Sequence, residues 1–118
     1  MAKASTTPVE VTLELGDDTY VLVPTLSAIR KINRHFGGLD SALNRLRVMD
    51  FEAAAYVLSV GADVKGRDAD ALAGKLYRSG LIEATPPLVE YVAILLNGGK
   101  RLDDGDQPEP SGADEGNG

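Results

Sequence analysis

This chain of 118 residues has one histidine and no cysteine, which limits the catalytic chemistry available to it. A Cys–His nucleophile is impossible, and any serine nucleophile would depend on His35 alone. His35 follows the basic stretch "RKINR" at the expected end of a helix, where a protonated imidazole suits the negative end of the helix dipole. We therefore predict no catalytic residue and do not expect an enzyme.

Three aspartates, Asp63, Asp68 and Asp70, lie close together in the stretch "DVKGRDAD". A calcium-binding EF-hand alternates its ligands and ends in a glutamate, and both features are missing here. A loop followed by a helix cap at Asp68 explains the same carboxylates. The chain also contains neither a Walker A nor a GxGxxG pattern. We therefore expect no metal site and no cofactor.

Residues 30–47 form the most basic part of the chain. Arg30 and Arg34 are four residues apart on one expected helix face, a like-charge pair that costs about 0.2–0.5 kcal/mol unless an opposite charge compensates it. A phosphate backbone, an acidic protein or the acidic end of this chain could supply that charge. The predicted basic face consists of Arg30, Lys31 and Arg34. Because aromatic residues are not interleaved with it, a small nucleic-acid-binding regulator is an alternative and not the leading reading.

The net charge of −6 is unevenly distributed. Residues 101–118 carry six acidic residues and one arginine, whereas residues 1–100 have a net charge of only −1. No apolar run is longer than that from Tyr91 to Leu96, which is far too short to span a membrane, and the lack of cysteine suits a reducing cytosol. We expect a soluble intracellular protein with a flexible N-terminus (1–8), a single domain (9–99) and a disordered acidic tail (100–118).

Strict alternation of apolar and polar residues from Val9 to Leu15 predicts a half-buried strand. Gly16-Asp17-Asp18 supplies a turn, and Tyr20 to Val23 is a second β-rich run, so the pattern predicts a β-hairpin. Because two strands are not stable alone, the hairpin must pack against helices.

Five helical patterns follow the hairpin. They span residues 26–36, 39–46, 51–60, 69–79 and 86–97, with expected N-caps at Thr25 or Ser27, Asp50, Asp68 and Thr85. In the fourth pattern Tyr77 is expected to point inward. The predicted fold class is α+β, with an N-terminal β-hairpin packed on a small bundle of about five short α-helices.

The last helical pattern is apolar on more than one side. Leu88 and four later residues form one stripe, while Val89, Ala93 and Ile94 place apolar groups elsewhere. Such a helix is either central to the core or covered by a partner. On the second interpretation, the predicted partner-binding residues are Tyr91, Val92, Ile94, Leu95 and Leu96.

The hairpin segment "VEVTLELGDDTYVLV", followed by "LDSALNRL", "DFEAAAYVLSVGA" and "LVEYVAILLNGG", resembles small tail proteins of siphovirus-like phages and gene transfer agents. That family is described as tail tube or tail assembly chaperone proteins. The resemblance covers residues 8–99 and depends on layout and a few apolar positions. It implies a non-enzymatic assembly chaperone that binds and solubilises the tape measure protein and promotes tail tube assembly. The rival within the family, a structural tail tube subunit, is disfavoured because only two short strands are expected.

The resemblance also implies where the protein acts and with what. It would work in the host cytoplasm, be absent from the mature particle, and contact the tape measure protein, the tail tube protein or further copies of itself. A longer form made by ribosomal frameshifting is a further implied partner. We hypothesise that Gly98-Gly99-Lys100 marks the slip site; an ordinary solubilising acidic tail is the alternative.

Overall fold

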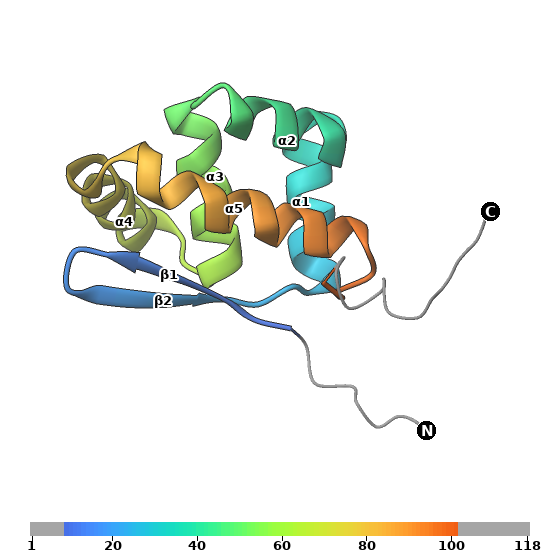
Figure 1. The fold of residues 1–118 in the computed structure, drawn as a ribbon, viewed down its shortest axis with the longest axis horizontal. Helices are drawn as coiled ribbons and strands as arrows, with labels where there is room; N and C mark the ends of the chain where they lie inside the picture. The colour runs from blue at the N-terminus through green and yellow to red at the C-terminus, as the bar shows by residue number, and fades with distance from the viewer. Residues whose placement is uncertain (1–8, 102–118) are drawn as a thin grey trace.

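The hairpin predicted at the start of the chain is present in the computed structural model, which describes residues 9–101 (Figure 1). Strand β1, Val11–Leu15, pairs antiparallel with β2, Asp18–Leu22. Gly16 in the turn has a φ of 64°, in the left-handed region that glycine enters at little cost. The alternation buries all three apolar side chains of β1 and leaves its two polar side chains exposed.

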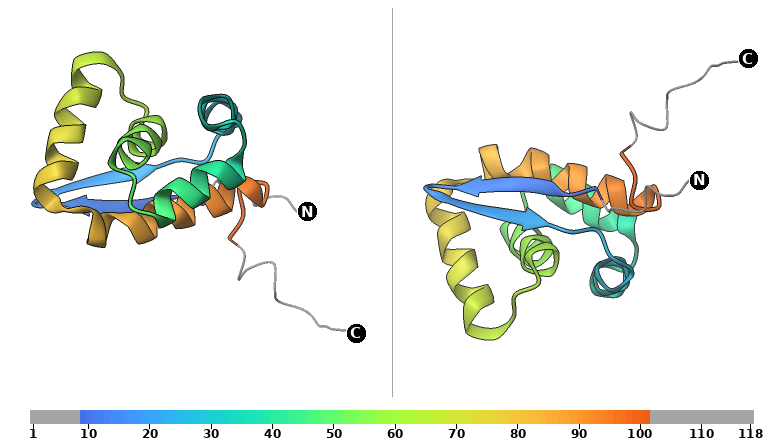
Figure 2. Two further views of the ribbon diagram at one scale, coloured as in Figure 1. Left: turned by 90° about the horizontal axis from the view of Figure 1, so that it is seen from above. Right: turned by 90° about the horizontal axis from the view of Figure 1, so that it is seen from below.

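The described residues form five helices after the hairpin, which confirms the α+β class. They are α1 (Leu26–Phe36), α2 (Leu39–Arg47), α3 (Phe51–Ala62), α4 (Gly66–Ser79) and α5 (Leu81–Leu96). Helix α5 runs lengthwise across the molecule, with the hairpin along one side and α2 along the other (Figure 1). Figure 2 shows α4 at the turn end of the hairpin, where the chain reverses into α5.

Two of the predicted helix caps are confirmed. The side chain of Thr25 accepts a hydrogen bond of 3.0 Å from the N–H of Ala28, and that of Asp50 accepts one of 3.1 Å from the N–H of Ala53. The Ala53 amide and the Arg45 guanidinium hold the pKa of Asp50 below its usual value. Both caps satisfy N–H groups that the first helical turn leaves without a partner.

The predicted starts of the last two helices were wrong. Helix α4 begins at Gly66, so Asp68 lies in its first turn, where its negative charge favours the helix dipole without capping. Helix α5 begins at Leu81, which places Thr85 inside the helix and leaves Pro86 and Pro87 there too. Thr85 is 6% exposed, so packing of this first turn outweighs the hydrogen bonds that the prolines remove. Tertiary burial has overridden a local start signal.

Helices α3 and α5 and strand β2 meet closely around Gly61. The N–H of Val23 donates to the Gly61 carbonyl over 3.2 Å, and a Cβ at Gly61 would lie 3.1 Å from Leu22 and 3.2 Å from the Tyr91 ring. The absent side chain therefore lets the strand and both helices approach one another. This contact fixes which side of α5 is turned toward the core.

Candidate partner-binding surface

Four of the five predicted partner-binding residues are core residues, so that prediction is corrected. Tyr91, Val92, Ile94 and Leu95 are each at most 5% exposed, and only Leu96 is open, at 52%. The Tyr91 hydroxyl donates a hydrogen bond of 2.7 Å to the Val23 carbonyl. Burial raises the pKa of Tyr91 above its usual value. The side of α5 with the denser apolar stripe is the side that the domain itself needs.

The open side of α5 is also apolar, and we call it the outer face of α5. It consists of Ile82, Pro86, Val89, Ala93 and Leu96. Ile82 and Pro86 are exposed, the first at 78%, and Val89 and Ala93 are half-buried. A row of apolar side chains about 21 Å long therefore faces water along one helix. Rows of this kind mark interaction sites more often than scattered single residues do.

The spacing within the outer face is four, three, four and three residues. This is the alternation with which two helices pack side by side, because it keeps the apolar seam turned toward the partner. The sequence carried this signal. It was missed because Val89 and Ala93 were assigned only to an unspecified second side of the helix, and because Ile82 and Pro86 were placed before or at the start of the helix.

The turn between α2 and α3 borders the same face. The Thr85 hydroxyl donates to the Met49 sulfur over 3.4 Å, which holds this turn against the first half of α5. Met49 has a φ of 61° and is 45% exposed, and the neighbouring Val48 is also open. Flexible methionine side chains adapt to different apolar partners. No sequence pattern identified these two residues, because neighbours in a turn show no period.

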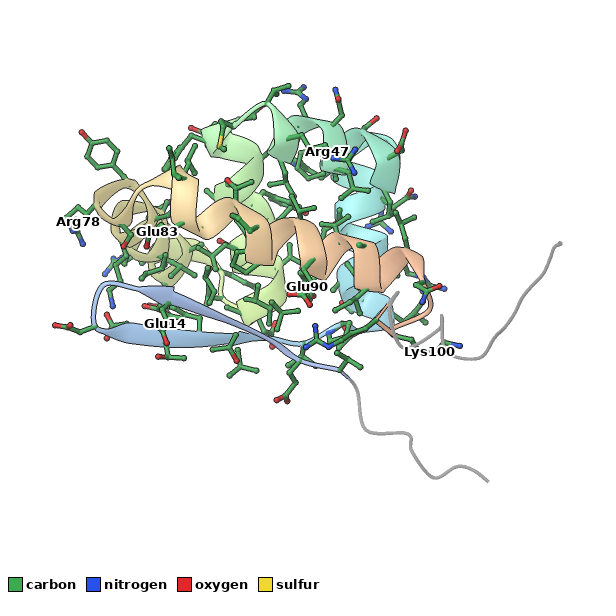
Figure 3. All side chains as sticks on the ribbon, viewed as in Figure 1. Glu14, Arg47, Arg78, Glu83, Glu90 and Lys100 are labelled. Atoms are coloured by element: carbon green, nitrogen blue, oxygen red, sulfur yellow. The ribbon has the colours of Figure 1, made fainter. Side chains whose placement is uncertain are left out.

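Acidic side chains line the other flank of the outer face. Glu83 and Glu90 lie on the side of α5 toward the hairpin (Figure 3). Glu90 forms an ion pair with Arg101, whose guanidinium also donates to the Glu10 carbonyl. The outer face thus has an apolar flank and an acidic flank.

The predicted basic face lies on α1. Arg30 and Arg34 are exposed and Lys31 is half-buried, and none of the three forms an ion pair with any residue between 9 and 101. His35 stacks on the ring of Tyr56 with centroids 3.8 Å apart, an arrangement that packs α1 against α3. The structure therefore gives His35 a packing role, and within residues 9–101 no carboxylate pairs with the three cations.

Of the three aspartates considered for calcium, Asp63 and Asp68 are at helix ends, and Asp70 lies further along α4 and is exposed. Asp63 ends α3 with a φ of 60°, and Asp68 lies in the first turn of α4. Within the described residues, no three His, Cys, Asp or Glu side chains gather as a metal site would require. These positions account for both aspartates by local backbone geometry and the helix dipole.

Gly98 and Gly99 also have a local role. Both have positive φ, 72° and 86°, and the Gly99 N–H donates to the Ile94 carbonyl over 2.8 Å. They therefore end α5 and satisfy one of its last carbonyl groups. The hypothesis of a frameshift at this point concerns the codons and stays a prediction.

Two further findings bear on function. None of the helices in the described part of the chain is long and apolar enough to cross a membrane. Comparison with protein-family models, with curated proteins and with solved structures found no match. The outer face of α5 and the basic face are therefore the features of this protein that bear on its function.

Proposed function

We propose that this protein is an assembly chaperone for a phage-type tail, which binds the helical tape measure protein and promotes assembly of the tail tube around it. The observation that carries the proposal is the outer face of α5, an open apolar row with the spacing of a helix-pairing seam. The order of hairpin and helices implied by the resemblance is a second support.

In this proposal a client helix lies along the outer face of α5 with its own apolar residues against Ile82, Val89 and Leu96. The neighbouring Val48 and Met49 extend the contact on one side. One such contact is small, so useful affinity comes from many copies bound along one long client. The protein acts in the host cytoplasm, and the frameshifted longer form is the copy that links the client to the tube subunit.

Co-expression with a tape measure protein encoded nearby, followed by size-exclusion chromatography with light scattering, tests the proposal. We expect the client to stay soluble in a large complex with many copies of this protein. Ile82→Glu with Leu96→Glu should release the client. Tyr77→Glu is the matched control, because Tyr77 is an equally exposed apolar residue outside the outer face, at 77%.

Other results of that experiment would contradict the proposal. If the client precipitates while this protein alone forms rings or tubes, it is a structural tail tube subunit. If the control variant releases the client as fully as the outer-face variant does, α5 is not the binding surface.

One observation favours a second candidate, a nucleic-acid-binding regulator. The basic face has no internal ion pair among the described residues, so its three cations can contact phosphates. This candidate predicts a salt-dependent mobility shift on duplex DNA that disappears when Arg30, Lys31 and Arg34 are replaced by glutamate. No shift at low salt would exclude it.

A further inference from the structure

The large and the small side chains of the outer face stand in two separate columns. Ile82, Val89 and Leu96 are seven residues apart and form one column, and Pro86 and Ala93 form the other. Residues seven apart lie almost above one another on a helix. A partner helix therefore fits with its own large side chains over Pro86 and Ala93, which we call the low column because their side chains are shorter.

Charge distinguishes the two flanks of this surface. Glu83 and Glu90 each follow a large residue of the outer face by one position, so both lie along the flank toward the hairpin (Figure 3). The opposite flank is the apolar turn that contains Met49. A partner helix consequently meets the Glu83 carboxylate and the Glu90–Arg101 ion pair on one side and apolar groups on the other.

The acidic character is greatest around Glu83. A surface pocket between the hairpin turn and the junction of α4 and α5 is lined by four carboxylates and two cations, Lys75 and Arg78, and so has a net charge of −2. The carboxylates belong to Glu14, Asp17, Asp18 and Glu83. Lys75 is engaged by Asp18, and Glu83 has no ion pair with any residue from 9 to 101. Glu83 is thus available to a cation from outside.

A second copy of this chain is a poor occupant. When two identical helices pair antiparallel about a two-fold axis, each flank faces the same flank of the other copy. Because Glu90 is paired with Arg101, Glu83 is the carboxylate that would be uncompensated on this flank of both copies, and like charges across an interface oppose its formation. The surface fits a different chain, whose flank is basic.

We propose that the outer face of α5 binds an amphipathic helix of another protein, with large apolar residues in a three-and-four spacing and lysine or arginine on the flank that meets Glu83. The inference builds on the proposed function, since the client would supply this helix. The charge of the flank is nevertheless testable without any client.

Two synthetic helical peptides provide the probe. Both have the same leucine and alanine seam, and one has lysine and the other glutamate along the flank. Binding to the full chain is measured by fluorescence anisotropy at low and high salt. We expect the lysine peptide to bind more tightly, by up to about fivefold for each exposed ion pair. The preference should disappear in about 1 M salt, where charges are screened within roughly 3 Å.

Charge-reversal variants of the protein show which residue causes the preference for the lysine peptide. Glu83→Lys should abolish or invert the preference between the two peptides, and Ala93→Leu should weaken both equally by filling the low column. Asp70→Lys, an equal charge change on the exposed side of α4, should leave the preference unchanged. Circular dichroism confirms that each variant is folded before it is compared.

Several results would overturn the inference. Equal affinities for both peptides would show that the partner's flank need not be basic. If neither peptide binds, the outer face of α5 does not pair with a helix. If light scattering shows that this protein is a dimer and that Leu96→Glu dissociates it, a second copy of the chain occupies the outer face. If the peptides bind equally but Ile82→Glu with Leu96→Glu still releases the client, only the flank assignment fails and the proposed function stands.

Discussion

Helices α1 and α5 both lie between the core and solvent, but they differ in the polarity of the side that faces solvent. Helix α1 buries Ala28 and Ile32 and exposes Arg30 and Arg34, so its two sides differ in polarity. Helix α5 buries seven residues and still has an apolar side facing water. A strongly amphipathic helix shows from its sequence which side is open, whereas a helix that is apolar all round does not.

The two helices also differ in what holds them. Thr25 caps α1, whereas no side chain of the described residues caps the start of α5 at Gly80. Because α5 also contains Pro86 and Pro87, which remove backbone hydrogen bonds, its stability depends mainly on tertiary packing. Substitutions on the inner side of α5 should therefore cost the most, and substitutions on the open side of α1 the least.

The largest expected effect is the difference in stability loss between substitutions on the inner and outer sides of α5. Leu88→Ala should lower the free energy of unfolding by about 2–5 kcal/mol, because Leu88 is fully buried and the change leaves a cavity. Leu96→Ala on the same helix should change it by less than about 0.5 kcal/mol. Urea denaturation measures both. Equal losses would mean that the inner and outer sides are wrongly assigned.

The next largest effect is expected at Gly61, where α3 packs closely against α5 and β2. Gly61→Ala should cost about 1–3 kcal/mol, since the added methyl group would press on Leu22 and Tyr91. Gly74→Ala in α4 is the control, because its Cβ would be at an ordinary 3.5 Å from the Arg78 guanidinium. That change should stabilise the protein by up to about 1 kcal/mol through helix propensity. Thermal unfolding that ranks the two variants the other way would contradict this packing.

A smaller loss of stability is expected from the Tyr91 hydroxyl, which lies on the inner side of α5 and bonds to the chain directly after β2. Tyr91→Phe removes the hydrogen bond to the Val23 carbonyl and should cost about 1 kcal/mol at neutral pH. Tyr77→Phe is the control, because Tyr77 is exposed. If both variants are equally stable, the hydroxyl of Tyr91 contributes nothing to the fold.

Burial of the same hydroxyl makes stability depend on pH. The pKa of Tyr91 is raised in the folded state, while the unfolded tyrosine ionises near pH 10. Above that pH the unfolded state binds fewer protons, so the free energy of unfolding falls as pH rises. The stability gap between the wild type and Tyr91→Phe should therefore narrow above about pH 10. A constant gap in urea titrations would show that Tyr91 keeps an ordinary pKa.

The smallest effect belongs to the open side of α1. Arg30→Gln should stabilise the protein by a few tenths of a kcal/mol at low salt, because it relieves repulsion from Arg34 and leaves the favourable charge of Arg34 in the last turn of α1. Arg45→Gln should act in the opposite direction, because Arg45 pairs with Asp50. Thermal unfolding at low and high salt measures both. A clear loss of stability in Arg30→Gln would mean that an acidic group already compensates the basic face.

Local signals predicted most of the fold. The alternation in β1, the turn at Gly16, and the caps Thr25 and Asp50 each depend on neighbours within a few residues, so the sequence shows them directly. The starts of α4 and α5 were mispredicted because Asp68 and Thr85 are good caps in isolation. In α5 the chain gains more by extending the helix, because Ala84 and Thr85 are then buried in the core. The residues that extend α4, from Gly66 to Asp68, are exposed, and no contact with the core explains its earlier start.

The candidate site was only partly predictable. In the predicted basic face Arg30 and Arg34 are exposed and Lys31 is half-buried, since charged side chains are rarely buried without partners. Binding of an anion by this face stays a prediction. Tyr77, expected to point inward, is exposed, because α4 contacts the rest of the molecule over a narrow stripe around Leu72 and Leu76. The partner-binding residues were chosen from the wrong side of α5, because both sides are apolar.

The sequence by itself determined the α+β class, the hairpin, the first three helices and the exposed position of Arg30 and Arg34 on α1. Each of these depends on short-range patterns of polarity and capping. Only the tertiary structure decided which side of α5 is left open. The decisive contacts are long-range, with Tyr91 bonded to Val23 and packed close to Gly61. Residues so far apart in the chain leave no periodic signal. The row from Ile82 to Leu96 became a candidate binding surface because the core had already used the other side.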